Sequence, residues 1–216
     1  MPSTLVHVAF AGLLAAALLG DTFDGRALLV VLAVTAIPDL DSFLALLWTP
    51  AHRTVLHTLV IPILAGGLLW YDLRVRDRSF VAGRWGPRGV RIAWVSVLAF
   101  AVAGIALDLF SGGAVALWPV DSNFYVIRGK IELSNQRGIV QTFVDLDPET
   151  PQTGPTSPGN ATEIHVDTGV DPTEGTEPKN VERVFPVVRS GWQLLVVLVG
   201  TGVTAARFAV DQRVTE

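Results

Sequence analysis

The chain of 216 residues contains no cysteine, one methionine and only two lysines, Lys130 and Lys179. Without cysteine it has no disulfides, no thiolate metal ligands and no cysteine nucleophile. A metal site would therefore use His, Asp or Glu side chains, which suit zinc or a harder cation. The scarcity of lysine and the net charge of −4 argue against nucleic-acid binding, which needs a basic surface.

Charged residues are scarce as well, at 17% of the chain, against about a quarter in soluble domains. Half of the residues are hydrophobic, and the mean hydropathy is +0.46. The apolar residues come in blocks long enough to cross a bilayer, which takes about 20 residues each. We therefore predict an all-α membrane protein. The low lysine count and the pI near 5.5 are typical of a salt-loving archaeon, with a high-GC bacterium as the alternative.

Five apolar blocks predict about five transmembrane helices. The first block lacks the positive start and the clear cleavage site of a signal peptide, so we expect a retained helix. The second block is interrupted by the sequence Pro-Asp-Leu-Asp. The blocks are Leu5–Leu19, Ala27–Trp48, about Thr54–Tyr71, Val90–Phe110 and Gly191 to about Val210.

An arginine-rich connection between the third and fourth blocks predicts the orientation. By the positive-inside rule it is cytoplasmic, which puts the N-terminus and residues 111–190 outside the cell membrane and the C-terminus in the cytoplasm. The predicted organisation is a four-helix membrane domain at 1–120, a polar extracytoplasmic insertion at 121–190, and a last transmembrane helix with a cytoplasmic tail at 191–216. The six arginines are Arg74, Arg76, Arg78, Arg84, Arg88 and Arg91.

The insertion has two parts. Alternating β-branched residues from Tyr125 to Val144, with a turn sequence at 134–138, predict a β-hairpin. The stretch from 145 to 180 is rich in Pro, Thr, Gly and acidic residues, which predicts a flexible or disordered segment. Within it Glu163, His165 and Asp167 alternate, a pattern more typical of an acidic loop than of a metal site.

Six ionisable residues lie in or beside the predicted helices, where they are costly and usually mark function. The alternating direction of the helices brings all six toward one face of the membrane. Simpler interpretations exist for each: His7 at the membrane interface, His52 in a loop, the aspartates as helix caps, or Arg53 paired with Asp39 or Asp41. The six are His7, Asp39, Asp41, His52, His57 and Asp108.

Three histidines and three aspartates predict a metal site. Imidazole and carboxylate are ligands for zinc and related divalent ions, and a cation would compensate the carboxylate charges. With an open position, such a metal would activate water for hydrolysis. We therefore predict all six as metal ligands, zinc as the first choice of divalent metal, and His57 and Asp41 as catalytic residues, with His57 or a free carboxylate as general base.

These motifs resemble the YdjM-like family, over roughly residues 1–120. The family is described as LexA-binding, inner-membrane-associated, metal-dependent hydrolases, a label itself inferred from motifs. The first matching residue is an early histidine, His7. The resemblance is then carried by Ile37-Pro38-Asp39-Leu40-Asp41, His52-Arg53-Thr54-Val55-Leu56-His57-Thr58, Leu107-Asp108 and Trp118-Pro119.

The resemblance implies a metal-dependent hydrolase. Its pattern is also distantly similar to zinc-dependent phospholipase C, which implies a phosphoester or lipid-linked substrate. Many members carry a histidine one helical turn before the later aspartate, where this chain has Gly104. The LexA link is not carried over, because the predicted site faces outward.

Our leading hypothesis is a membrane-bound metal-dependent hydrolase that acts on a membrane-associated substrate. The first alternative is a non-catalytic metal-binding or structural membrane protein. The second is an ion-coupled transporter, against which the lack of an inverted repeat argues, although a homodimer would restore symmetry. The predicted partners are membrane lipids and a lipid-linked substrate, without nucleic acid and with a homo-oligomer left open.

Overall fold

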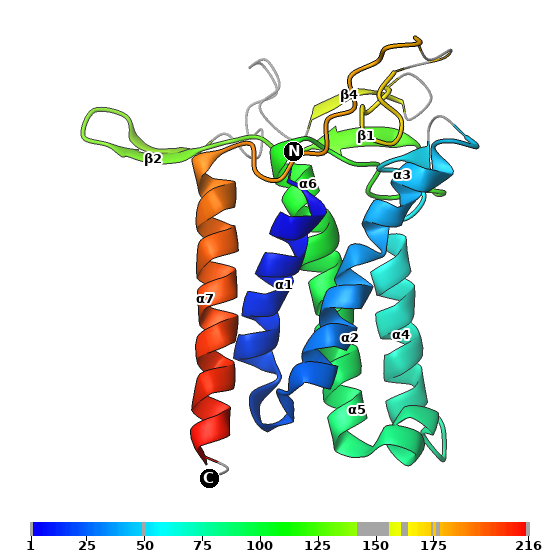
Figure 1. Ribbon diagram of the computed structural model, residues 1–216, viewed down its shortest axis with the longest axis vertical. Helices are drawn as coiled ribbons and strands as arrows, with labels where there is room; N and C mark the ends of the chain where they lie inside the picture. Colours follow the sequence, from blue (N-terminus) through cyan, green and yellow to red (C-terminus); the bar gives the residue numbers. More distant parts are fainter. Residues whose placement is uncertain are drawn as a thin grey trace.

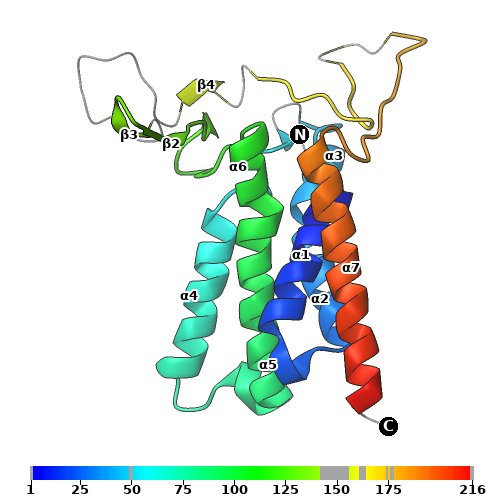
Figure 2. The same ribbon diagram turned by 90° about the vertical axis from the view of Figure 1, so that its left-hand side faces the viewer.

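The computed structural model describes residues 2–48, 51–141, 156–160, 164–173, 175 and 178–214. Its main feature is a bundle of five helices that lie side by side (Figure 1, Figure 2). One of them, α5, continues through the π-helical segment η4 (Phe100–Ala106) into α6 (Leu107–Ser111). The five are α1 (Thr4–Leu18), α2 (Gly25–Ala36), α4 (Val60–Arg74), α5 (Phe80–Ala99) and α7 (Gly191–Val214).

Two stretches of the described chain are long and apolar enough to cross a membrane, Phe80–Ser111 and Gly191–Asp211. A third span results if α2 is joined to the turn η2 (Pro38–Leu40) and α3 (Asp41–Leu44), from which it is bent by 44°. Helices α1 and α4 have 15 residues each, fewer than the roughly 20 of a full span. The structure therefore supports two or three spans and does not establish the predicted five.

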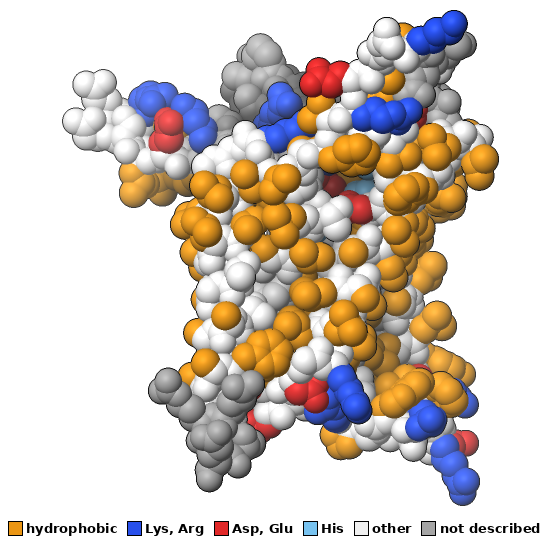
Figure 3. All heavy atoms as spheres, viewed as in Figure 1, with side chains coloured by type: hydrophobic (Ala, Val, Ile, Leu, Met, Phe, Trp, Pro, Cys, Tyr) orange, Lys and Arg blue, Asp and Glu red, His pale blue; other side chains and the backbone are white. Residues whose placement is uncertain are grey.

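The sides of the bundle are apolar, while charged side chains gather toward its two ends (Figure 3). Large apolar side chains stand exposed on several helices, including Leu29 on α2, Leu68 on α4 and Leu198 on α7. A wide exposed apolar surface is expected where lipid, and not water, surrounds the protein. The surface therefore agrees with a membrane location.

Small residues let α1 and α7 approach closely. A Cβ atom at Gly200 would lie 2.3 Å from the carbonyl oxygen of Ala9, and one at Gly12 would lie 2.8 Å from Thr204 Oγ1. Contacts of this kind are typical of helix pairs in membranes, where close van der Waals packing replaces the hydrophobic effect. The last helix is thereby held against the first.

Helix α4 begins at Val60, six residues after the predicted start of the third block. Pro62 lies in its first turn. Backbone N–H groups there have no acceptor within the helix, so the missing N–H of proline removes no helical hydrogen bond. Residues 51–59 form turns ahead of the helix. The expectation that His57 lies within the third helix is therefore wrong: it lies in the segment before it.

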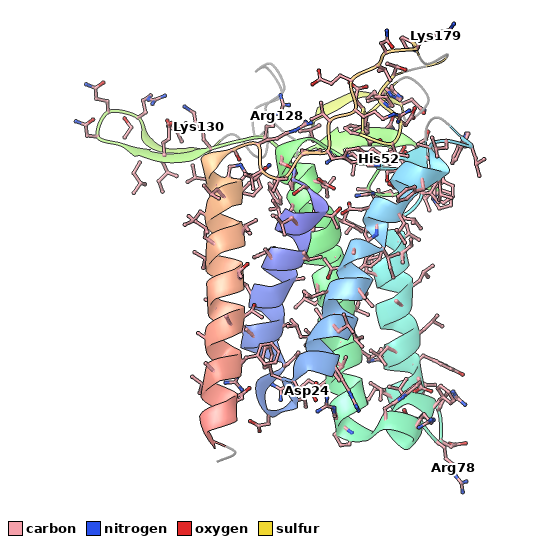
Figure 4. All side chains as sticks on the ribbon, viewed as in Figure 1. Asp24, His52, Arg78, Arg128, Lys130 and Lys179 are labelled. Atoms are coloured by element: carbon pink, nitrogen blue, oxygen red, sulfur yellow. The ribbon has the colours of Figure 1, made fainter. Side chains whose placement is uncertain are left out.

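The arginine-rich connection and His52 lie at opposite ends of the bundle (Figure 4). Asp72 near the end of α4 accepts hydrogen bonds from Ser79 Oγ at 2.6 Å and from the Phe80 N–H at 2.9 Å. The chain then breaks at Gly86, whose φ is +65°, before the long part of α5 begins. This end of the bundle is thus closed by a tight, polar turn.

Within its described residues, the insertion contains two antiparallel strand pairs. Strands β2 (Ile131–Ser134) and β3 (Gly138–Gln141) form the predicted hairpin. Strand β1 (Asn123–Val126) pairs with β4 (Thr156–Asn160), which lies inside the stretch predicted to be flexible. The described segment 164–173 follows β4, and its apolar side chains pack against β1. Much of the remaining stretch lies outside the described residues.

Candidate functional site

The segment 51–59 carries two of the candidate residues, His52 and His57, and is held against the turn that follows α6. The Arg53 carbonyl accepts a hydrogen bond from the Val115 N–H at 2.9 Å. The Thr58 hydroxyl donates to the Trp118 carbonyl at 2.7 Å. The His-Arg-x-x-x-His-Thr motif and the later Trp-Pro turn are therefore adjacent in space, although about 60 residues separate them.

Asp41 connects two histidines. Its side chain is fully buried, with Oδ1 at 2.8 Å from His52 Nδ1 and Oδ2 at 2.8 Å from His57 Nδ1. Because an ionised carboxylate only accepts hydrogen bonds, both Nδ1 atoms carry the proton. The Nε2 atoms of the two rings are then left for other partners.

The Nε2 atom of His57 lies at the centre of the cluster. It is 3.1 Å from Asp108 Oδ2 and 3.5 Å from Asp39 Oδ1. His7 Nε2 approaches the same Asp108 Oδ2 at 3.7 Å. Two imidazoles from separate parts of the chain and two carboxylates thus converge on one buried point.

His7 is oriented by the irregular part of the long helix. Its Nδ1 lies 2.5 Å from the carbonyl oxygen of Ala103, in the π-helical segment η4. A carbonyl only accepts, so Nδ1 donates and Nε2 faces Asp108 with its lone pair. Histidines that bind metals commonly donate their second ring N–H in this way, and π-helical turns often occur at functional sites.

Arg53 binds Asp108, and not Asp39 or Asp41, the pairing that was considered as a simpler interpretation of the sequence. Its Nη2 lies 2.5 Å from Asp108 Oδ1, and its Nη1 donates to the Gly113 carbonyl at 2.6 Å. Both side chains are buried. Asp108 therefore has one oxygen bound to the guanidinium and the other facing the histidines. In the sequence, the feature that marks Arg53 as a partner for a buried carboxylate is its position as a single arginine between two histidines in an apolar stretch.

The cluster carries excess negative charge. Three aspartates, Asp39, Asp41 and Asp108, contact His57, and one guanidinium, that of Arg53, is bound to Asp108. With neutral imidazoles, two negative charges remain uncompensated in a largely buried place. Such charges are costly unless a cation or protonated histidines compensate them.

The donor atoms suit a metal ion in type and spacing. His57 Nε2 and Asp39 Oδ2 are buried without a hydrogen-bond partner among the described residues. Ligands of tetrahedral zinc are roughly 3.3 Å apart, and the donor pairs around His57 and Asp108 are separated by 3.1, 3.5 and 3.7 Å. Within the described part of the chain, however, no group of three or more such side chains is already arranged to hold a metal, so the metal remains a prediction.

A cavity of about 190 Å³ opens above the cluster. Figure 3 shows a recess near this end of the bundle, with acidic and histidine side chains inside it. One side is lined by His52, Arg53 and His57, and the other by the insertion, including segment 167–170 and Arg189. The role of the insertion was left open by the sequence analysis, and in the structure it forms part of the cavity wall.

The second predicted alternation does not form a comparable centre. His165 Nε2 lies 3.3 Å from Asp167 Oδ1, and its Nδ1 lies 4.0 Å from Asp171 Oδ2. The two carboxylates thus approach opposite edges of the ring and do not converge on one point. Glu163 lies outside the described residues.

Gly104 lies where α2 and η4 touch. A Cβ atom there would be 3.2 Å from both Pro38 Cγ and the Thr35 carbonyl oxygen. A side chain at this position would have to displace the turn that carries Asp39. The departure from the family pattern therefore coincides with close helix packing in this chain.

The comparisons with known proteins place the chain in a family. No curated protein and no solved structure matches it. A family model, that of the YdjM inner membrane protein, matches residues 1–150 and so includes the whole cluster and Arg53. The family description and the apolar helices agree on a membrane location. Because the match covers more than half of the 216 residues, the chain belongs to the YdjM inner membrane protein family.

Proposed function

We propose that the protein is a membrane-bound, metal-dependent hydrolase that acts on a membrane-associated phosphoester. The observation that carries the proposal is the convergence of two imidazole Nε2 atoms and two carboxylates in a buried cluster with excess negative charge. A divalent metal, zinc first, would polarise a substrate oxygen or activate water for hydrolysis. The residues proposed to hold it are His7, Asp39, His57 and Asp108.

Asp41 is proposed as a positioning residue and not as a metal ligand. Both of its oxygens are engaged by Nδ1 atoms of His52 and His57. Carboxylates that orient a ligating imidazole in this way increase its basicity and hold its ring orientation. This role differs from the six-ligand set expected from the sequence.

His52 is better placed than His57 to accept a proton from water or substrate. Both rings line the cavity, but the His52 side chain is 14% exposed, whereas that of His57 is 1% exposed and contacts three aspartates. The Nδ1–H bond to Asp41 leaves the Nε2 of His52 as the acceptor. An aspartate-supported histidine beside the cavity is a suitable general base.

Arg53 favours an anionic substrate. Its guanidinium holds Asp108, while its Nε atom is buried without a partner among the described residues and the side chain lines the cavity. A guanidinium N–H bonds phosphate oxygens well. This argues for a phosphoester over a neutral substrate.

We further propose five membrane crossings, with the cluster on the outer side. The five helices run side by side at the same level (Figure 2), and Arg78 of the arginine-rich connection lies at the end opposite His52 (Figure 4). By the positive-inside rule the arginine-rich end is cytoplasmic. The cluster, the cavity and the insertion then face outward, and the C-terminus is cytoplasmic.

Metal content tests the proposal. The detergent-purified protein is expected to hold near-stoichiometric zinc by mass spectrometry. His57→Ala and Asp39→Asn are expected to lose it while remaining folded, and His165→Ala and Asp24→Asn serve as matched controls. A screen of phosphoesters then identifies the substrate class. A wild type that stays metal-free after zinc or manganese is supplied would overturn the hydrolase proposal.

One observation supports a second candidate, an ion-coupled transporter with a metal-free proton relay. His57 lies within 3.5 Å of carboxylates of Asp39, Asp41 and Asp108, so that one imidazole contacts three carboxylates directly. Buried His and Asp chains of this kind carry protons in membrane transporters. Proton flux into liposomes that depends on Asp108, from metal-free protein, would favour this candidate over the hydrolase.

A further inference from the structure

Arg189 lies between two cavities at the same end of the bundle. It lines the polar cavity above the candidate metal centre and also an apolar groove of about 470 Å³ beside α6 and the start of α7. Neighbouring residues of α6 line the two spaces: Asp108 lines the polar cavity and Leu107 the groove. The two spaces are therefore adjacent and share one cationic side chain.

The groove offers mainly apolar contacts to a ligand. The Ser111 hydroxyl already donates to the Leu107 carbonyl at 2.6 Å, and the Gln193 side-chain oxygen accepts from the Arg189 backbone N–H at 2.7 Å. Apart from Arg189 and Ser190, the remaining lining is apolar and includes Phe110 and Trp192, which are 59% and 43% exposed. An apolar chain is the occupant that suits these surfaces.

Two guanidiniums at the junction suit an anion, beside the carboxylates of Asp39, Asp108 and Asp167 that also line the polar cavity. Among the described residues, no carboxylate is paired with the Arg189 guanidinium. At the floor of the polar cavity, the buried Arg53 Nε also lacks a partner within the described chain. Two guanidiniums thus stand on different sides of one cavity, and guanidinium is a strong partner for phosphate oxygens.

We propose that the two cavities form one binding site for an anionic, single-chain amphiphile such as a lipid phosphate. Its anionic group lies in the polar cavity between Arg53 and Arg189, and its apolar chain lies in the groove along Leu107, Phe110 and Trp192. The proposal rests on the proposed function for its anionic end, because a bound cation offsets the three aspartates below. Arg189 is a positioning residue that selects the amphiphile.

A dodecyl phosphate with a bromine at the far end of its chain tests the proposal in the zinc-loaded, full-length protein in detergent. Bromine quenches tryptophan fluorescence at short range, so the quenching lost on Trp192→Phe reports chain occupancy of the groove. We expect saturable quenching whose half-saturation rises about tenfold in Arg189→Gln, the scale of one charge-assisted hydrogen bond. Arg128→Gln removes an exposed arginine at the same end that lines neither cavity, and should leave the half-saturation unchanged.

Two further ligands separate the sources of binding. Bromododecanol, which has the chain without the charge, should bind at least about tenfold more weakly. Inorganic phosphate should displace dodecyl phosphate only at far higher concentration. Equal affinity of inorganic and dodecyl phosphate, or quenching that does not respond to Arg189→Gln, would overturn the proposal.

The outcomes for this site and for the proposed function are separable. Zinc binding and phosphoester hydrolysis without Trp192 quenching would remove the amphiphile site and leave the hydrolase. Arg189-dependent quenching in a protein that binds no metal would keep the amphiphile site, with the two guanidiniums as its anion partners, and remove the hydrolase.

Discussion

Replacing Arg53 by methionine is expected to destabilise the protein strongly. The buried guanidinium contacts Asp108 at 2.5 Å and the Gly113 carbonyl at 2.6 Å. Methionine keeps much of the side-chain volume but removes the guanidinium that is bound to Asp108, so the uncompensated charge of the three aspartates rises from two to three. Breaking a buried ion pair from one side typically costs about 3–5 kcal/mol.

The loss can be measured as a change in melting temperature. For a chain of this size, each kcal/mol corresponds to roughly 2–4 °C, so a decrease of about 10 °C is expected by scanning fluorimetry in detergent. Arg78→Met is the matched control, because Arg78 is exposed at the opposite end of the bundle. Its melting temperature should remain close to that of the wild type.

A double variant distinguishes charge compensation from simple packing. Arg53→Met combined with Asp108→Asn again leaves two uncompensated negative charges, as in the wild type, so part of the stability should return. The coupling between the two substitutions is expected to be about 1–3 kcal/mol, the scale measured for contacting residues. A single variant as stable as the Arg78→Met control, or strictly additive losses, would refute a structural ion pair between Arg53 and Asp108.

Three other predictions concern packing and the outer turn. Gly200→Ala should lower the melting temperature, because the new Cβ atom would lie 2.3 Å from the Ala9 carbonyl oxygen. Gly202→Ala is the control and should not lower it, because nothing lies within 4 Å of a Cβ atom there. Equal melting temperatures of the two variants would contradict the close contact of α1 and α7. Gly104→His should cost about 1–3 kcal/mol of stability, because the side chain must displace Pro38 and Thr35. A melting temperature that stays unchanged would show that the α2–η4 contact is looser than described. The Tyr125 hydroxyl bond to Asp121 lowers the pKa of Asp121 and raises that of Tyr125, so Tyr125→Phe should return the carboxyl pKa toward its ordinary value in an NMR titration. The stabilisation from this bond is present above the ordinary Asp pKa and is lost as the pH falls through the lowered one; an unshifted Asp121 titration in the variant would count against the bond.

Hydropathy alone predicted a helical membrane protein, because blocks of about 20 apolar residues have few other stable locations. It also placed the five helices approximately. The hairpin followed from β-branched alternation around a turn sequence, and β2 and β3 confirm it. The start of the third helix was misplaced, because hydropathy does not distinguish an apolar turn segment such as 51–59 from a helical one.

The candidate residues were identified from the sequence, because ionisable side chains are rare in apolar blocks and are easily recognised there. Their partners were not. Asp41 contacts His52 and His57, which lie 11 and 16 positions later in the chain, and Arg53 contacts Asp108, 55 positions later. Arg189, much later still, lines the same cavity. Such contacts depend on helix rotation, on the π-helical turn at Ala103 and on the turn following α6, none of which local sequence patterns specify. The sequence by itself therefore determined which side chains are the candidates for chemistry, and only the tertiary structure decided which of them meet.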